Sequence, residues 1–159
     1  GVGGNKFSPG GSMSRAMFVK SLANLQGGDI SGYANRFTDV RDDAWYAKSV
    51  AWGAANGIVT GMSEAQFGPN YKVNREQMAV FLYRYAKYAG YGDMSGDRSG
   101  LGAFRDKDRI SAWAADAVAW AVGHGLLQGK DGGVFDPAGT ATRAEAAAIL
   151  ARFHQLVKK

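Results

Sequence analysis

The sequence predicts an all-α fold built from helix–loop–helix repeats. Three observations support this prediction: the chain repeats itself, apolar residues recur at helical spacing, and polar residues that start helices stand at equivalent places in the copies. The chain has 159 residues, of which 46% are hydrophobic and 21% charged, and no apolar run approaches the roughly 20 residues needed to cross a bilayer. We therefore expect one compact, soluble module without a membrane span.

The repeat is clearest in two stretches, 57–82 and 125–150, which align without a gap. A glycine, a phenylalanine, a proline and an arginine keep the same spacing in both, and the start of the chain supplies a third copy of the last three. The equivalent residues are Phe7, Pro9 and Arg15 in the first copy, Phe67, Pro69 and Arg75 in the second, and Phe135, Pro137 and Arg143 in the third. All three prolines of the chain thus occupy one position of the repeat.

The upstream half of the repeat is present in the second and third copies only. The stretches that begin at Phe37 and Phe104 correspond, with one extra residue before the first tryptophan of the later copy. The first copy begins at Gly1 and lacks this half, so we expect an incomplete repeat at 1–29, followed by complete repeats at 30–90 and 96–159. Gly-rich stretches at 27–32 and 90–102 are interpreted as linkers between them.

The first helix of each complete copy is expected at about 44–56 and 112–123. Each contains two tryptophans seven residues apart, which places both on one helix face: Trp45 with Trp52, and Trp113 with Trp120. Such a stripe is more often core than ligand platform, but only one indole of each pair can face fully inward if the repeats pack side by side. Gly57 and Gly125 stand where a left-handed residue would end the helix.

The second helix of each copy opens with an N-cap residue. Ser14, Asn74 and Thr142 precede the arginines, and Thr142 with Glu145 forms a capping box. Each arginine therefore falls at the first helical position, where the helix dipole disfavours a cation by about 0.3–1 kcal/mol. An external carboxylate or phosphate would explain this choice, because the guanidinium, the free N–H groups and the dipole would all attract it. Internal pairing with Asp39 or Asp106 is the alternative, and helix physics alone leaves both open.

In their order and spacing these motifs resemble those of the S-layer homology family, over nearly the whole chain apart from the linkers. The matching stretches are F-T-D at 37–39, the paired tryptophans, G-I-V-T-G at 57–61, F-G-P at 67–69 and T-R-A-E at 142–145. The third copy departs from the pattern at 126–128, and the first copy lacks the capping glutamate. The resemblance implies three repeats in a pseudo-threefold arrangement within one chain, the first of them incomplete.

The resemblance also implies a function. Modules of this kind anchor surface proteins non-covalently to the bacterial cell wall, by binding a secondary cell-wall polysaccharide in grooves between repeats. The polymer is anionic and often carries a pyruvylated amino sugar, whose carboxylate would meet the arginines. The implied carbohydrate-binding residues are Arg15, Arg75, Arg143, Asp39, Asp106, Trp45, Trp113, Gly57, Gly61, Gly125 and Gly129. The expected location is extracellular, in the cell wall or surface layer.

Other classes of function find less support in the residues. The chain has no cysteine, and its two histidines have neither metal-ligand spacing nor a nucleophile beside them, so we expect no enzyme, metal or cofactor. The net charge of +5 permits an anionic partner, but no basic stripe indicates nucleic acid. A protein–protein role in assembling a surface array stays open as the alternative, as does self-association through the incomplete first repeat.

Overall fold

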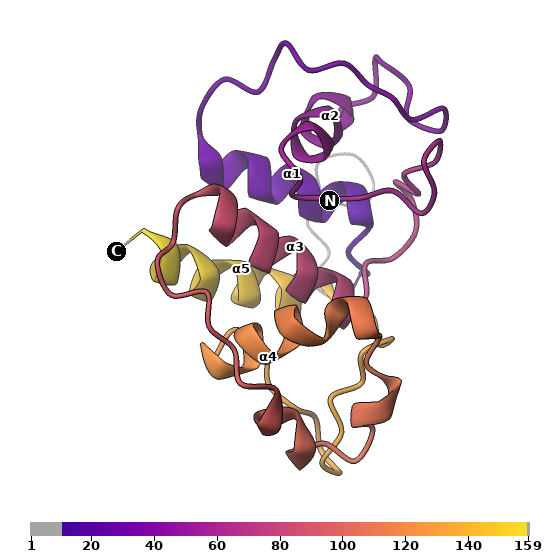
Figure 1. The fold of residues 1–159 in the computed structure, drawn as a ribbon. Helices are drawn as coiled ribbons and strands as arrows, with labels where there is room; N and C mark the ends of the chain where they lie inside the picture. The colour runs from indigo at the N-terminus through magenta and orange to yellow at the C-terminus, as the bar shows by residue number, and fades with distance from the viewer. Residues whose placement is uncertain (1–10, 159) are drawn as a thin grey trace. The chain divides into compact units, whose positions relative to one another are not determined.

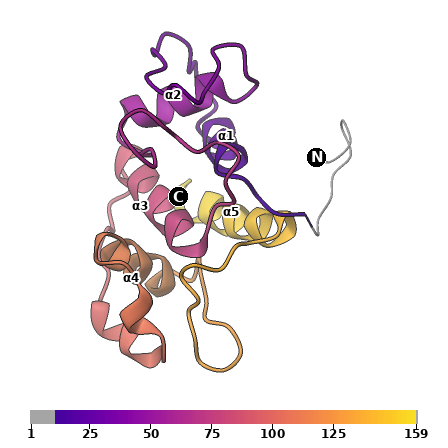
Figure 2. The ribbon, with the colours of Figure 1, turned by 90° about the vertical axis from the view of Figure 1, so that its right-hand side faces the viewer.

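The computed structural model describes residues 11–158 and is helical, with no strand among these residues. This confirms the predicted all-α class. The chain divides into two compact units, one made of residues 14–72 and the other, in its described part, of 11–13 and 73–158. Figures 1 and 2 show the ribbon from two sides. The pseudo-threefold arrangement and the three repeat boundaries stay predictions.

The unit of residues 14–72 contains two α-helices that pack on each other, α1 (Arg15–Gln26) and α2 (Ala47–Ala55) (Figure 1). Gly53 of α2 allows close contact, because an added β-carbon would lie 3.1 Å from Val59 and 3.5 Å from Val19 of α1. The core of this unit also includes Trp52, which is fully buried. The loop that follows α2 lies over this core.

In its described part, the second unit contains three α-helices and three short 3-10 helices. Its α-helices are α3 (Arg75–Tyr88), α4 (Ala115–Gly123) and α5 (Arg143–Val157), and its 3-10 helices are η1 (Arg98–Ala103), η2 (Lys107–Arg109) and η3 (Ala112–Ala114). Trp120 of α4 lies at the centre, with its ring near Tyr83 of α3 and Phe153 of α5. Aromatic packing therefore joins the three helices into one core.

The helix starts confirm the expected capping. The side chains of Ser14, Asn74 and Thr142 accept a hydrogen bond from the third residue of their helices, and capping boxes form at Asn74 and Thr142. Gly57 and Gly125 have positive φ angles of 71° and 73° and follow the C-cap residues Asn56 of α2 and His124 of α4. Because these signals act over a few residues, the sequence located them correctly.

The expected start of the first helix was wrong in the second copy, whereas in the third copy the helical segment does begin at Ala112, with the 3-10 helix η3 ahead of α4. α2 begins at Ala47 rather than near Ala44, so Trp45 lies in the preceding turn, and Trp113 lies in η3 rather than in α4. A turn or a 3-10 helix does not keep the α-helical period, so the two tryptophans of a pair do not share one face. No side chain caps either α-helix, which left the sequence without a start signal.

The linker interpretation of 90–102 also needs correction. Residues 98–103 form η1, whose Leu101 is buried, and an added β-carbon at Gly96 would lie 2.7 Å from the backbone nitrogen of Trp120. The glycines of this segment therefore include one that permits close packing on α4. Gly-rich composition alone did not distinguish a packed segment from a flexible one.

Candidate functional site

The first turn of α1 is closed by the loop that carries the phenylalanine and proline of the second copy. The backbone N–H of Arg15 donates to Tyr71 O at 2.8 Å, and that of Ala16 donates to Pro69 O at 3.1 Å. The N–H of Met17 donates to the Ser14 side chain. Carbonyls of the protein thus take the N–H groups that would otherwise attract an anion.

The first turn of α3 repeats this arrangement with the loop of the third copy. The N–H groups of Arg75 and Glu76 donate to Gly139 O at 2.9 Å and Pro137 O at 3.0 Å. At α5, the N–H of Arg143 donates to Gly11 O at 2.8 Å. Main-chain hydrogen bonds therefore join the starts of α1 and α3 to proline loops, and the start of α5 to Gly11.

The Arg15 side chain binds the same loop as its backbone N–H. Arg15 is buried, its Nε donates to Phe67 O at 3.1 Å and its Nη2 donates to Thr60 O at 2.7 Å. The guanidinium carbon lies 4.7 Å from the centre of the Phe67 ring. The side chain therefore ties α1 to both ends of the 60–67 segment.

Arg75 occupies the equivalent position in the other unit. It is buried, its Nε donates to Phe135 O at 2.8 Å, its Nη2 donates to Gln128 O, and its guanidinium carbon lies 4.7 Å from the Phe135 ring centre. Phe135 and Gln128 are the repeat equivalents of Phe67 and Thr60. The two units thus build the same contact independently.

Arg143 differs from the other two arginines. It is half-buried, its Nε reaches Ser12 O at 3.4 Å, and its Nη1 is buried without a hydrogen-bond partner in the described part of the chain. The repeat equivalent of Phe67 is Phe7, which lies outside the described residues together with Pro9. Arg143 is the least engaged of the three by the described protein groups.

The two aspartates hold the same loops from the opposite side. Asp39 accepts the N–H groups of Phe67 and Gly68, one on each carboxylate oxygen and both at 2.8 Å. Asp106 accepts those of Phe135 and Asp136 at the same distance. Each phenylalanine therefore has its N–H bound by an aspartate and its C=O bound by an arginine. We call the pair of N–H bonds to each aspartate the aspartate clamp, and the extra residue of the third copy leaves it unchanged.

These contacts correct the physical reasoning about the arginines. An external anion was expected because the N–H groups of the first turn would be free, whereas loop carbonyls accept those of the first two residues of α1 and α3. The Arg15 and Arg75 guanidinium groups donate to main-chain carbonyls, a partner that neither alternative considered. A direct role of the arginines in ligand binding stays a prediction.

Burial and nearby acidic side chains shift the pKa of these arginines in opposite directions. Burial lowers the pKa of Arg15 to about 10, although the nearby Asp39 charge opposes the change. Burial also lowers the pKa of Arg75, against the charges of Asp136, Glu145 and Asp106. Arg15 still carries its positive charge at neutral pH, so its bonds to carbonyls are charge-assisted.

The four glycines proposed as site residues serve two different structural needs. Gly57 and Gly125 adopt positive φ angles with open space around them. At Gly61 an added β-carbon would lie 2.4 Å from Ser63 O and 2.7 Å from the Phe37 ring, and at Gly129 it would lie 2.6 Å from the Phe104 ring. The second pair is therefore required for close packing beneath the loop.

The two predicted sugar platforms are both on the surface. Trp45 is 59% exposed and Trp113 is 62% exposed, whereas their partners Trp52 and Trp120 are buried. This confirms that only one indole of each pair faces inward. Because an exposed indole leaves a large apolar face in water, these two are the strongest candidates for contact with a ligand.

Comparison with protein families agrees with the repeats. The S-layer homology domain matches residues 36–79 and 103–147, which together make up more than half of the chain. The chain belongs to the S-layer homology family. The two matches cover the aspartate clamp, the exposed tryptophan and the arginine-bearing helix start of the second and third copies.

Curated relatives of the chain include enzymes and surface proteins. The chain is 32% identical over 94% of its length to exoglucanase XynX of Acetivibrio thermocellus and covers 14% of that protein. It is 29% identical over 96% of its length to the surface-layer 125 kDa protein of Lysinibacillus sphaericus, covering 12%. A cellulosome-anchoring protein of Acetivibrio thermocellus is 24% identical over 96% of the chain, which covers 34% of it.

The chain corresponds to only a small part of each of these relatives. An enzymatic name therefore describes a much longer protein. The S-layer homology repeats themselves form a non-catalytic module and point to the bacterial cell surface, as the sequence predicted. Among residues 11–158, no helix is both long and apolar enough to cross a membrane, and no group of acidic or histidine side chains could hold a metal ion.

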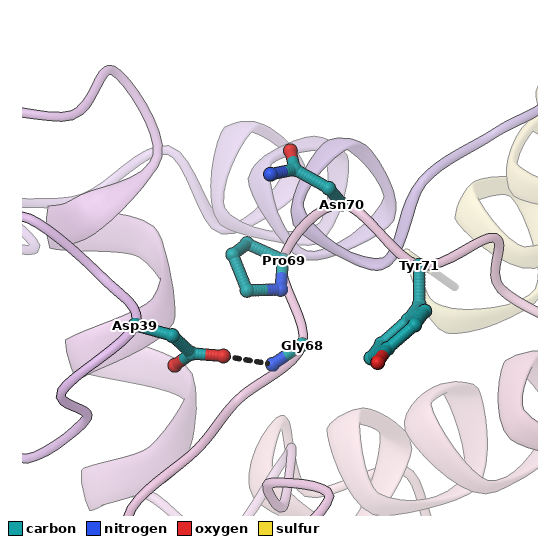
Figure 3. A pocket seen from close by; sticks show the side chains of 5 residues that line it. All are labelled: Asp39, Gly68, Pro69, Asn70 and Tyr71. Atoms are coloured by element: carbon teal, nitrogen blue, oxygen red, sulfur yellow. Dashed lines mark hydrogen bonds between the residues drawn. The ribbon is translucent and has the colours of Figure 1, made fainter.

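Sequence reasoning missed two features of these S-layer homology loops. Buried Glu76 accepts both the backbone N–H of Ser111 at 2.9 Å and its hydroxyl at 2.7 Å, which fixes the segment before η3. The second feature is a cavity of about 300 Å³ lined by Asp39, Gly68, Pro69, Asn70 and Tyr71 (Figure 3). A signal existed for both, because Glu76 and Tyr71 replace alanine and glycine at the equivalent positions of the other two copies.

The aspartate clamp leads to a prediction about acid stability. Burial of Asp106 opposes its ionisation, but hydrogen bonds from Phe135 and Asp136 outweigh this and lower its pKa below 3.8. Its stabilising contribution is therefore complete above about pH 4 and is lost as the pH falls through the folded-state value. We expect Asp106→Asn to cost about 1–2 kcal/mol at pH 7 and to flatten the pH dependence between pH 5 and 2, measured by urea unfolding.

Asp131→Asn is the matched control, since Asp131 is an exposed carboxylate of the same loop region. This variant should keep the wild-type stability at pH 7 within about 0.5 kcal/mol. An Asp106→Asn protein with wild-type stability across the whole range would show that the clamp contributes nothing.

Proposed function

We propose that this chain anchors a surface protein non-covalently to the bacterial cell wall by binding a secondary cell-wall polysaccharide. Membership of the S-layer homology family supports the surface location. The printed names of two relatives, a surface-layer protein and a cellulosome-anchoring protein, support attachment as the task. The attached cargo belongs to the larger protein, since the chain spans only a small part of these relatives.

One observation carries the carbohydrate part of this proposal. Trp45 and Trp113 stand at equivalent positions of two repeats, and both indoles are about 60% exposed. Burying such a ring in the core would have been favourable, so its repeated exposure indicates a contact with something outside the chain. A pyranose ring suits it, because its apolar face stacks on an indole while its hydroxyl groups stay hydrogen-bonded.

The polar residues divide between two roles in this proposal. Arg15 and Arg75, with Asp39 and Asp106, hold the loops in shape, as do the glycines beneath them. Arg143 is the arginine that takes an anionic substituent, such as the carboxylate of a pyruvylated amino sugar, because residues 11–158 engage its guanidinium less than those of Arg15 and Arg75.

Two or more weak contacts with one polymer chain would give firm attachment. When one repeat is bound, the next meets the same polymer at a high effective concentration, so overall affinity exceeds that of each contact. Loss of one platform is therefore expected to weaken retention several-fold, and loss of both to weaken it far more.

Pulldown on purified cell-wall sacculi tests this function. We expect the wild-type chain to be retained and to be released after the secondary polymer has been stripped, with no second protein present. Trp45→Ala and Trp113→Ala should each lower the affinity for purified polymer by about tenfold, and the double variant by more than either alone.

Tyr88→Ala serves as the control, since Tyr88 is also a partly exposed aromatic residue, at the end of α3. Its affinity should equal that of the wild type. Equal retention on intact and stripped sacculi would refute polysaccharide anchoring. Binding that requires a second surface protein would favour an assembly module instead.

A further inference from the structure

The cavity beside Asp39 has features that the family resemblance did not predict. We call it the Tyr71 pocket, defined by its lining residues Asp39, Gly68, Pro69, Asn70 and Tyr71. It holds about 300 Å³, and in Figure 3 the Tyr71 ring and the Asp39 carboxylate lie on opposite sides of Gly68. The pocket lies wholly within the unit of residues 14–72.

The tyrosine ring is exposed, yet its backbone is held firmly. Tyr71 is 65% exposed, while its N–H donates to Gly68 O at 3.2 Å and its C=O accepts the N–H of Arg15 at 2.8 Å. The ring also lies close to the loop, since a β-carbon added to Gly68 would come within 2.7 Å of Tyr71 Cδ2 and 2.8 Å of Met62 Cγ. An exposed aromatic ring on a fixed turn is a preorganised surface for a flat apolar ligand face.

Polar groups at the edge of the pocket could orient a ligand through hydrogen bonds. Each oxygen of Asp39 accepts one backbone N–H, which leaves further acceptor capacity for hydroxyl groups. Asn70 is exposed and offers an amide with both a donor and an acceptor. An aromatic face bordered by a carboxylate and an amide matches a neutral sugar ring, with one apolar face and hydroxyl groups around its rim.

The equivalent loop of the third copy keeps the clamp but lacks this surface. Gly139 replaces Tyr71, Asp136 replaces Gly68 with a φ of 59°, and Lys130 replaces Met62. Lys130 Nζ and Asp136 form an ion pair at 2.6 Å, where the second copy has the uncharged residues Met62 and Gly68. The two loops make the same backbone contacts, but the second copy presents an exposed aromatic ring and the third copy presents an ion pair.

We propose that the Tyr71 pocket is a specificity-determining subsite that stacks a neutral pyranose unit of the wall polymer, and that the third copy has no such subsite. The proposal rests on the polysaccharide-binding function proposed above and adds the chemical class of one contact. It assigns the pocket an uncharged sugar, whereas the anionic substituent is assigned to Arg143.

Binding of oligosaccharides released from the wall polymer, measured by calorimetry with the whole chain, tests the proposal. Tyr71→Ala should weaken binding about tenfold, and Tyr71→Phe should bind like the wild type, because stacking needs the ring and not the hydroxyl. Tyr33→Ala is the matched control, since Tyr33 is 40% exposed in the same unit and lines a different cavity.

Mild acid treatment, which removes ketal-linked carboxylates from the oligosaccharides, separates the two subsites. The loss caused by Tyr71→Ala should persist on the treated material, whereas the loss caused by Arg143→Ala should disappear. If the Tyr71→Ala effect disappeared as well, the pocket would be binding the charged substituent, and the proposal would be overturned.

A second variant moves the subsite to the third copy. Lys130→Met combined with Asp136→Gly and Gly139→Tyr recreates the pocket-forming residues of the second copy and is expected to raise polymer affinity several-fold. Unchanged affinity in a folded triple variant would overturn the claim that these positions determine stacking.

A wild-type chain that binds no polymer refutes anchoring itself, whereas equal binding by Tyr71→Ala and wild type refutes only the stacking subsite.

Discussion

Arg75→Met is expected to lower the free energy of unfolding by about 2–4 kcal/mol. The substitution keeps most of the apolar stem, but it leaves the carbonyl oxygens of Phe135 and Gln128 without their charge-assisted donors. It also removes the guanidinium from the face of the Phe135 ring. Urea unfolding followed by circular dichroism measures the loss.

Arg143→Met is the matched control, because Arg143 occupies the same first helical position of α5. Its one described side-chain bond, to Ser12 O, is 3.4 Å long, so we expect a cost under about 1 kcal/mol. The two variants should also separate by function, since Arg143→Met should lose polymer affinity while it remains folded. Equal stability losses in both proteins would contradict the distinction between a positioning and a binding arginine.

Trp120→Ala is expected to destabilise the protein by about 3–5 kcal/mol. Trp120 is fully buried, its Nε1 donates to Asp93 O at 2.9 Å, and its ring lies 5.6 Å from that of Tyr83. Alanine would leave a cavity between helices and an unpaired carbonyl. Thermal unfolding monitored by near-ultraviolet circular dichroism would report the loss of this packing.

Trp113→Ala provides a control seven residues away. Trp113 is 62% exposed, so its removal should change the free energy of unfolding by no more than about 0.5 kcal/mol. It should nevertheless lower polymer affinity, as proposed above. Similar destabilisation by both substitutions would mean that the exposed indole is part of the core after all.

The arginines show why the candidate site was only partly predictable. Their place at the first helical position follows from the caps Ser14, Asn74 and Thr142, which the sequence displays directly. Their partners are carbonyls more than 40 residues away in the chain, at Thr60 and Phe67 for Arg15. Backbone carbonyls are the same at every residue, so no side-chain pattern could identify them.

The tryptophans show the same limit in the fold. Their spacing was correct, but it indicated one shared helix face because it assumed a helix from about residue 44 onward. The structure places Trp45 in a turn and Trp113 in η3, and packing of the helices decides that Trp52 and Trp120 enter the core. The sequence did show that only one indole of each pair could be buried.

The helical class, the repeats, the capped helix starts and the left-handed glycines after α2 and α4 could all be predicted from the order of residues. All of these depend on side-chain chemistry within a few residues, or on equivalent residues in the copies. The folded structure was needed to find that Asp39 and Arg15 hold one loop between them and that Tyr71 borders a pocket. Those outcomes depend on main-chain groups brought together from distant parts of the chain, where each hydrogen bond is satisfied only once the helices have packed.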